Sequence, residues 1–380
     1  MTLSAFRDPS QFLANARSLG WLDEIEFSYI DVGVSGGIPG FWRQFEPNLR
    51  AIGFDPLITE IDRLKSAEKN PKICYEAAFV GSNGEKPEQN GNSMFSLTSA
   101  ARAAKAANFD YIKEEFNRGA ELGWSDRSIV LDEWIKTQNM PSPDVLKSDV
   151  DGFDFDVLSG AAKMLAEGTT LAVISECQFH EPIGARRPVF AEIDRFMRDC
   201  GYRLFDMNIY HYTRAELPGT FQHEIFAQTE TGQIQFCDAL YMLDPMADAQ
   251  SLERILNSGE PSKLTKLMLL YGAFGLPDCA AALISKMKTL GISAGPIDLD
   301  QALDMLVHQT GSGHQSYPEY IQAFDANPRA WFPIRHDLTI ARQAAELRRR
   351  SRLLNLEYSI RRTLSKIGGC LRPSSGWPLQ

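Results

Sequence analysis

The sequence predicts an α/β fold with a doubly wound, mostly parallel sheet, followed by a separate α-helical region. Two observations carry this prediction. Between residues 27 and 243, short apolar runs alternate with helical patterns, which is typical of strands joined by helices that cover a parallel sheet. After Asp244-Pro245 the β signal stops, and only the helical spacing of apolar residues continues.

The strand candidates are short apolar runs. The first ends in glycines and is followed by helix-like spacing at 41–45, so strand, glycine loop, helix and strand are expected in that order. The last two runs are joined by a polar and aromatic loop at 206–220, which leaves the final strand able to return antiparallel. The runs span 27–32, 49–54, 73–80, 128–131, 144–146, 171–175, 202–205 and 235–243.

One long connection, 81–126, interrupts this alternation. It begins with loop-forming residues and continues with helical spacing at 99–122. Long connections inside compact domains often serve as lids or binding loops. We therefore expect this segment near a ligand.

The C-terminal part carries helical spacing at 252–256, 264–274, 279–290 and 299–307, so we expect a sheet domain at 1–245, a helical domain at 246–340 and a helical tail at 341–380. Within the tail, residues 341–366 hold eight basic and two acidic side chains, a local charge of 8 − 2 = +6. Such a segment suits peripheral contact with an anionic membrane or a protein partner. A solvated helix face followed by a disordered end is the alternative.

Composition narrows the classes of protein and partner. The formal net charge of -10 and the pI near 5.2 argue against a protein that binds nucleic acid through its overall electrostatic field. The six cysteines form no Cys-x-x-Cys pair, which predicts reduced thiols. No secretory h-region and no stretch of roughly 18 apolar residues occurs, so a cytoplasmic protein is expected.

The glycine loop after the first run suits a nucleotide-like cofactor. Asp31 precedes Gly33, Gly36 and Gly37, whose Gly-x-x-Gly-Gly spacing lacks the Gly-x-Gly-x-x-Gly pattern of dinucleotide sites. An anion at position 31 would repel phosphate but could hold an ammonium group. Asp55, which follows the next run, is placed to accept hydrogen bonds from the ribose hydroxyls of a cofactor. The alternative is an ordinary turn aspartate before proline. The cofactor-binding candidates are Asp31, Gly33, Gly36, Gly37, Asp55 and Ala77.

A second motif, residues 147–161, brings acids to the carboxyl end of another predicted strand, where open α/β sheets bind ligands. Asp149 is expected to face the active site. Asp154 and Asp156 suit the dipole of the following helix, and Asp151 suits a helix cap better than a substrate contact or metal ligand.

These residues resemble the FkbM family of methyltransferases. Lys-Ser-Asp-Val-Asp-Gly at 147–152 and Val-Leu-Ser-Gly-Ala at 157–161 resemble its Lys-x-Asp-Val-Glu-Gly and Val-Leu-x-Gly-Ala signatures, and weaker similarity extends over 28–244. The resemblance implies a class I, Rossmann-like sheet of seven strands and S-adenosylmethionine as cofactor. The chain departs from the family where Asp151 replaces glutamate and where the loop at 31–37 lacks the usual asparagine.

Methyl transfer to a hydroxyl requires alignment and a base, so carboxylates and imidazoles at strand ends are the catalytic candidates. Asp149, Glu176 and His180 meet that condition, and the histidine has the most suitable unperturbed pKa, although a structural hydrogen bond is its equal alternative. An oxygen-rich set of Asp149 and Asp151 with His180 would suit magnesium, but no spacing is diagnostic of a metal site, so none is assigned. The substrate-binding candidates are Asp151 together with His211 and Tyr212, which are expected on a loop after the sixth strand.

The leading functional hypothesis is an S-adenosylmethionine-dependent O-methyltransferase for a hydroxyl of a sugar or glycan-derived acceptor, hence an enzyme of polysaccharide modification. The acceptor class follows only from the family's frequent polysaccharide contexts. A non-catalytic module that binds a glycan-assembly partner or membrane surface is the alternative from another class. An NAD-dependent enzyme is disfavoured by the glycine spacing.

Overall fold

The computed structural model describes residues 10–84, 94–106, 123–221, 228–260, 262–309 and 315–331. The chain forms two compact units, 1–314 and 315–380. The predicted domain boundaries at 245 and 340 stay predictions, and the basic segment 341–366 lies outside the described residues.

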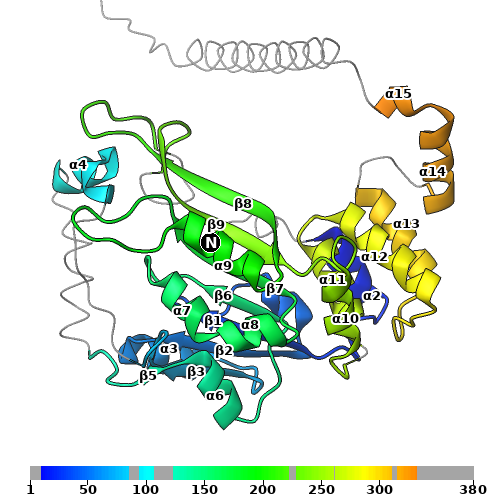
Figure 1. Cartoon of the computed structure of the whole chain (residues 1–380), viewed down its shortest axis with the longest axis horizontal. Coiled ribbons are helices and arrows are strands. Elements are labelled where there is room, and N and C mark those ends of the chain that lie inside the picture. Colours follow the sequence, from blue (N-terminus) through cyan, green and yellow to red (C-terminus); the bar gives the residue numbers. More distant parts are fainter. Residues whose placement is uncertain are drawn as a thin grey trace, which may run out of the picture. The chain divides into compact units, whose positions relative to one another are not determined.

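The first unit is built on a seven-stranded sheet of order β3-β2-β1-β6-β7-β9-β8 (Figure 1). Four neighbouring pairs from β3 to β7 are parallel, and β9 is antiparallel to both β7 and β8. The predicted doubly wound, mostly parallel sheet and its antiparallel last strand are thereby confirmed. The strands are β1 (Phe27–Val32), β2 (Leu49–Asp55), β3 (Ile73–Ala77), β6 (Val145–Ser148), β7 (Ala172–Gln178), β8 (Arg203–Tyr212) and β9 (Gln233–Met242).

The central strands are almost wholly buried, because helices cover the sheet. Every residue of β6 is buried, and β7 is exposed only at its last residue. This explains why residues 145–146 and 172–174, which begin these strands, are continuous apolar runs rather than alternating ones. The helices of this part are η1 (Trp42–Phe45), α3 (Ile58–Ala67), η2 (Met94–Leu97), α4 (Ser99–Ala106), α6 (Leu131–Thr137), α7 (Asp154–Gly160), α8 (Ala162–Glu167) and α9 (Phe190–Asp199).

Two predicted elements differ in the structure. The run 128–131 is not a strand of the main sheet: β5 (Ser128–Ile129) pairs with β4 (Phe79–Val80) in a separate two-stranded sheet, and α6 begins at Leu131. The helical spacing at 41–45 yields only one 3₁₀ turn, because its aromatic rings pack onto β1, with Trp42 4.5 Å from Tyr29. Of the helix predicted at 99–122, α4 covers the described part.

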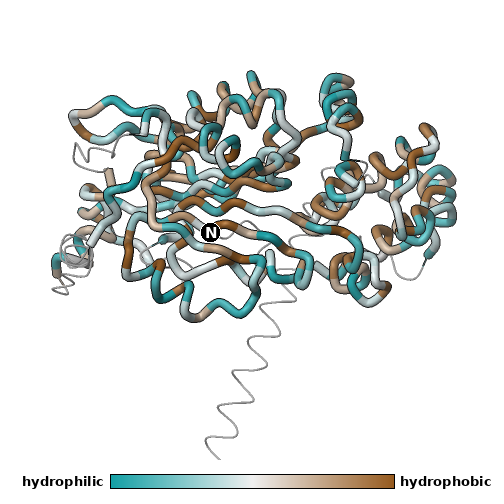
Figure 2. Tube along the Cα trace, turned by 90° about the horizontal axis from the view of Figure 1, so that it is seen from below, coloured by the Kyte–Doolittle hydropathy of each residue, from teal (hydrophilic) through white to brown (hydrophobic). Residues whose placement is uncertain are grey.

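The predicted C-terminal helices are confirmed. The helices are α10 (Ala249–Leu256), α11 (Lys263–Ala273), α12 (Pro277–Leu290) and α13 (Leu299–Gln309). Among them α12 buries Ala280, Leu283, Ile284 and Met287 on one face, whereas every residue of α11 is buried. Figure 2 shows hydrophobic and hydrophilic residues interspersed along the trace. An N-terminal helix, α2 (Gln11–Ser18), packs among the C-terminal helices (Figure 1). A Cβ on Gly272 would meet the ring of Phe12 at 2.2 Å, so glycine permits this close packing.

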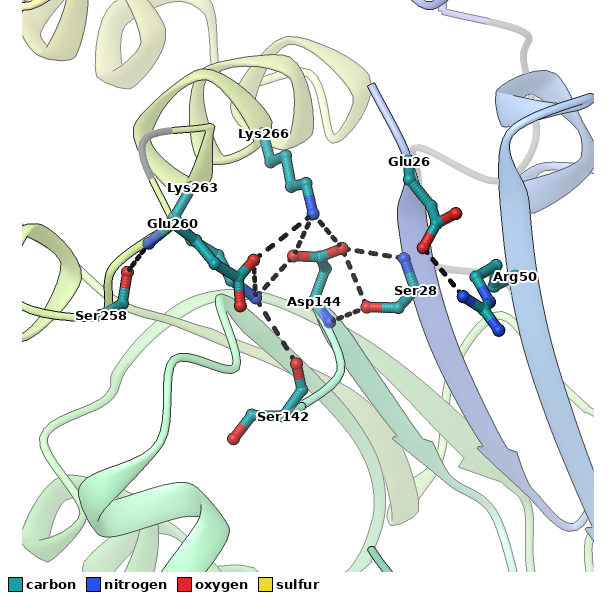
Figure 3. Close-up of polar contacts among 9 residues, drawn as sticks. All are labelled: Glu26, Ser28, Arg50, Ser142, Asp144, Ser258, Glu260, Lys263 and Lys266. Atoms are coloured by element: carbon teal, nitrogen blue, oxygen red, sulfur yellow. Dashed lines mark hydrogen bonds and ion pairs between the residues drawn. The ribbon is translucent and has the colours of Figure 1, made fainter. Parts of the chain in front are cut away.

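A buried polar cluster fastens α11 to the amino edge of the sheet (Figure 3). Asp144, directly before β6, is fully buried and accepts from Lys263 at 2.8 Å and from Lys266 at 2.9 Å. It also accepts the amide of Ser28 at the start of β1 at 2.8 Å. The Glu260 carboxylate lies 3.6 Å from the Lys263 ammonium group, so the two buried lysines face two carboxylates. The helical region and the sheet are thus joined through ion pairs withdrawn from water.

The second unit contains α14 (Tyr317–Ala326) and α15 (Pro328–Trp331), joined by ring contacts of Trp331 with Tyr320 and Phe324. Throughout the described part of the chain, no helix is long and apolar enough to cross a membrane.

Candidate functional site

A row of functional positions crosses the carboxyl edge of the sheet. Val32 pairs with Ser148 and Ser148 with Ser175, so the next residues, Gly33, Asp149 and Glu176, lie at one level on β1, β6 and β7. Asp238 on β9 is the register partner of Glu176. The structure therefore brings together the glycine loop and two of the three predicted catalytic residues.

The glycine loop has left-handed backbone at Gly33, Gly36 and Gly37, with φ of 83°, 85° and 92°. A Cβ on Gly33 would lie 1.9 Å from the carbonyl oxygen of Asp149, so the close approach at this glycine is to β6 rather than to a ligand. A Cβ on Gly36 would meet nothing within 4 Å, and its amide donates to Glu60 at 2.9 Å. Open space at Gly36 fits the approach of a ligand to the backbone there.

Asp31 is buried at the end of β1, and its carboxylate has internal partners. Lys147 lies 3.0 Å from Oδ1, and Tyr29 donates to Oδ2 at 2.9 Å. Burial raises the pKa of Asp31 to about 6 although the lysine opposes this shift. The ammonium partner predicted for Asp31 is thus supplied within the chain, while its contact with a cofactor stays a prediction.

Lys147 lies within the motif at 147–161, and the sequence predicted no role for it. Its ammonium contacts Asp31 and, at 3.3 Å, Asp149, and it donates to the carbonyl of Gly33 at 3.2 Å. Lys147 therefore holds the cofactor loop and the catalytic candidate Asp149 in one arrangement. A lysine in an otherwise apolar, buried strand is the signal that could have revealed it.

Asp55 and Ala77 end β2 and β3 and are register partners. Oδ1 of Asp55 accepts the amide of Leu57 at 2.8 Å, the bond expected of a turn aspartate, and burial raises the pKa of this carboxyl. The carbonyl of Ala77 accepts the Ser125 hydroxyl at 2.8 Å. The segment around Ser125 therefore borders the predicted ribose acid, as expected of the long connection 81–126.

The turn after β6 is closed by Asp154 rather than by Asp151. Asp154 accepts from the Ser148 hydroxyl at 2.6 Å and from the Gly152 amide at 3.3 Å, and burial raises its pKa to about 7. The predicted helix cap at Asp151 is wrong, because the N-cap position of α7 is Phe153. Asp151 is exposed and has a left-handed φ of 53°.

Glu176 and His180 have different surroundings. Glu176 is buried, and burial together with the nearby carboxylates raises its pKa well above the usual value. Nε2 of His180 lies 2.8 Å from the carbonyl of Ile234. Because a carbonyl only accepts, this nitrogen donates, which is the structural hydrogen bond that the sequence left as an alternative.

The predicted loop positions His211 and Tyr212 are the last residues of β8, because pairing with β9 continues to Tyr212. Tyr212 is buried against Phe236 and Phe95, and burial, aided by the charge of Glu176, raises its pKa to about 12. Tyr212 therefore lies near the row at the carboxyl edge. The adjacent His211 occupies the opposite side of the strand.

The strand order, with an antiparallel strand inserted between β7 and β8, and the ligand loop after β1 define a class I methyltransferase fold. Residues 52–204 match the family described as the Methyltransferase FkbM domain. This part of the chain is therefore similar to FkbM methyltransferase domains, and S-adenosylmethionine is the cofactor of this class of enzyme. The match begins beyond the glycine loop, where the sequence departs from the family pattern.

Several solved structures are similar to this chain. An FkbM methyltransferase from Methylobacillus flagellatus KT is 12% identical over 63% of this chain and 58% of its own, with a TM-score of 0.33. A TehB-like methyltransferase from Corynebacterium glutamicum is 14% identical over 64% and 92%, with a TM-score of 0.25. Magnesium protoporphyrin IX methyltransferase from Synechocystis PCC 6803 is 8% identical over 61% and 80%, with a TM-score of 0.28. No curated protein sequence matches the chain.

Proposed function

We propose that this chain is an O-methyltransferase that transfers the methyl group of S-adenosylmethionine to a hydroxyl of a sugar or glycan-derived acceptor. The observation that carries the proposal is the row of Gly33, Asp149 and Glu176 across β1, β6 and β7 at the carboxyl edge. The row joins a cofactor loop directly to acidic side chains. The acceptor class rests on the family resemblance.

The cofactor side of the row comprises β1 and β2. Gly36 has open space beside its backbone, and Asp55 ends the neighbouring strand with a carboxylate that suits ribose hydroxyls. When bound, S-adenosylmethionine supplies an electrophilic methyl group. Lys147 positions this side by holding both Asp31 and the Gly33 carbonyl.

The acceptor side comprises β6, β7 and β9. Asp149 is one-third exposed, with a side-chain exposure of 33%, and can therefore meet an acceptor hydroxyl. As the acceptor oxygen bonds to the methyl carbon, the methyl–sulfur bond breaks and the hydroxyl proton passes to the Asp149 carboxylate. Lys147, whose ammonium group lies 3.3 Å from the Asp149 carboxylate, orients this carboxylate before the transfer.

Titration calorimetry of the full chain with S-adenosylmethionine tests the cofactor half of the proposal. We expect saturable binding to the folded protein, and its absence would contradict the function. Incubation with methyl-labelled cofactor and a panel of glycosides tests the acceptor half. Label in a glycoside methyl ether supports it, whereas transfer only to nitrogen or carbon acceptors would exclude an O-methyltransferase.

A further inference from the structure

We propose, on the basis of the methyltransferase function above, that the acceptor carries a protonated amino group that binds to the Glu176 carboxylate beside the hydroxyl to be methylated. The ligand class is thus an amino sugar or a similar hydroxyl-bearing amine.

Glu176 is a buried acid with one carboxylate oxygen that lacks a hydrogen-bond donor among the described residues. The residue is 7% exposed, and the oxygen in question is Oε2. A buried carboxylate without a donor costs considerable free energy, so the group either takes up a proton or receives a donor from a ligand. Glu176 follows Ser175, the register partner of Ser148, so the residue lies level with Asp149 on the acceptor side of the row.

The surroundings of Glu176 favour a positively charged donor. Its pKa is raised by burial and then by the charges of Asp149, Asp154, Asp151 and Asp238. Three of these acids already have donors in the fold: Lys147 for Asp149, the Ser148 hydroxyl for Asp154 and the Tyr210 hydroxyl for Asp238. Carboxylate or phosphate groups on an acceptor would be repelled here, whereas an ammonium group would be attracted.

The position of these charges separates them from the cofactor. Lys147, Asp31 and Asp149 lie on β1 and at the end of β6, next to the glycine loop. Glu176 and Asp238 lie on β7 and β9, with β6 between them and β1. The positive charge of the cofactor, expected beside β1, therefore does not account for the acids on β7 and β9.

Aromatic side chains adjoin the same carboxylates. Asp238 and Phe236 are two residues apart on β9 and therefore lie on the same face of the sheet. Phe236 is the register partner of Gln178, which is two residues beyond Glu176. Tyr210 stacks on Phe236 with ring centroids 4.5 Å apart, and Tyr212 lies beside them. Phe236 is partly exposed. Aromatic faces next to carboxylates suit a ring that bears an ammonium group.

Pairing of the acceptor's ammonium group with Glu176 also determines which acceptor atom is methylated. An amine held against a carboxylate keeps its proton and so has no lone pair for attack on the methyl carbon. The neighbouring hydroxyl, which can lose its proton to Asp149, therefore remains the nucleophile. The amino group serves recognition, and the oxygen receives the methyl group.

Binding of matched glycosides to the full chain, saturated with S-adenosylhomocysteine, tests the proposal at neutral pH. The probes are methyl glucosaminide, its N-acetyl derivative and methyl glucoside. We expect the amine to bind roughly 10-fold or more tightly than either neutral probe, the size of a charge-assisted hydrogen bond. Equal binding of amine and N-acetyl derivative, or no detectable binding of the amine, would overturn the proposal.

The Glu176→Gln variant keeps the shape of the side chain and removes its charge. We expect it to reduce the preference for the amine to within about 3-fold, while Asp62→Asn on the exposed face of α3 keeps the full preference. If Glu176→Gln does not fold, Asp238→Asn is expected to weaken the preference instead. An undiminished preference in the folded variant contradicts the proposal. Failure of the wild-type chain to bind S-adenosylhomocysteine would instead contradict the methyltransferase function.

Discussion

The ammonium group of Lys266 donates to both carboxylate oxygens of Asp144, at 3.2 and 2.9 Å, across 122 residues of sequence. Lys263, one helical turn earlier, donates to the same carboxylate (Figure 3). Asp144 stands at the amino edge of the sheet, whereas the row of Gly33, Asp149 and Glu176 lies at the carboxyl edge. The helical region is thus attached on the side of the sheet away from the candidate site.

Asp144→Asn should destabilise the protein more than Lys266→Met. The first change leaves two buried ammonium groups with less compensation, at a cost of about 3–5 kcal/mol, whereas the second leaves Lys263 on Asp144. Lys288→Met, which removes a half-exposed ion pair with Asp300, should change stability by less than about 0.5 kcal/mol. Urea unfolding measures all three. Equal effects at Asp144 and Lys288 would contradict the buried-cluster interpretation.

Sequence patterns predicted the sheet because its central strands are buried on both faces. They failed at 128–131, where a short apolar run pairs with β4 outside the main sheet. They also failed at His211 and Tyr212, because the polar and aromatic residues at the end of β8 do not show a strand pattern. Spacing alone predicts the candidate site residues near glycines and strand ends, and their roles stay predictions. The contacts of Lys147 and Lys266 were not, because they join distant segments and leave no local periodicity.

Gly33→Ala should disrupt the loop. An added Cβ would lie 1.9 Å from the Asp149 carbonyl oxygen, and the backbone φ of 83° is unfavourable for alanine. We expect a loss of about 2–4 kcal/mol in stability and weaker cofactor binding. Gly40→Ala, which meets nothing within 4 Å, is the matched control and should leave both properties nearly unchanged. Thermal unfolding and calorimetry distinguish the two; an unaffected Gly33→Ala protein would refute the close approach.

Asp55→Ala should weaken S-adenosylmethionine binding by roughly 10- to 100-fold, because hydrogen bonds to a charged group are lost from the ribose hydroxyls. The bond from the Leu57 amide would also be lost, so stability should be measured alongside affinity. Asp62→Ala in the adjoining helix α3 is the control and should bind the cofactor like the wild type. An unchanged dissociation constant for Asp55→Ala would limit this acid to its turn.

Stability should fall as the pH rises from about 4 to about 7, in part through Asp154. Burial raises its pKa from 3.8 to about 7, so within this window the folded chain binds a proton that the unfolded chain lacks. Stability is therefore lost as pH rises, and Asp154→Asn should flatten the decline. Asp156→Asn, at an exposed position in the same helix, should leave the decline as in the wild type. Urea unfolding at about pH 5 and pH 8 measures the difference. If the free energy of unfolding falls equally between these two pH values in the wild type and in Asp154→Asn, the raised pKa does not belong to Asp154.

Asp149→Asn should reduce methyl transfer far more than His180→Gln. Removing a general base lowers kcat by roughly 100-fold or more, and asparagine at 149 keeps the size of the side chain. His180 already donates Nε2–H to the Ile234 carbonyl, a bond that the longer glutamine amide can partly replace, so its variant should keep kcat within about 3-fold. Single-turnover kinetics with saturating S-adenosylmethionine separate these effects from cofactor binding. The reverse order of effects would assign the base to His180 and restrict Asp149 to positioning the loop through Lys147.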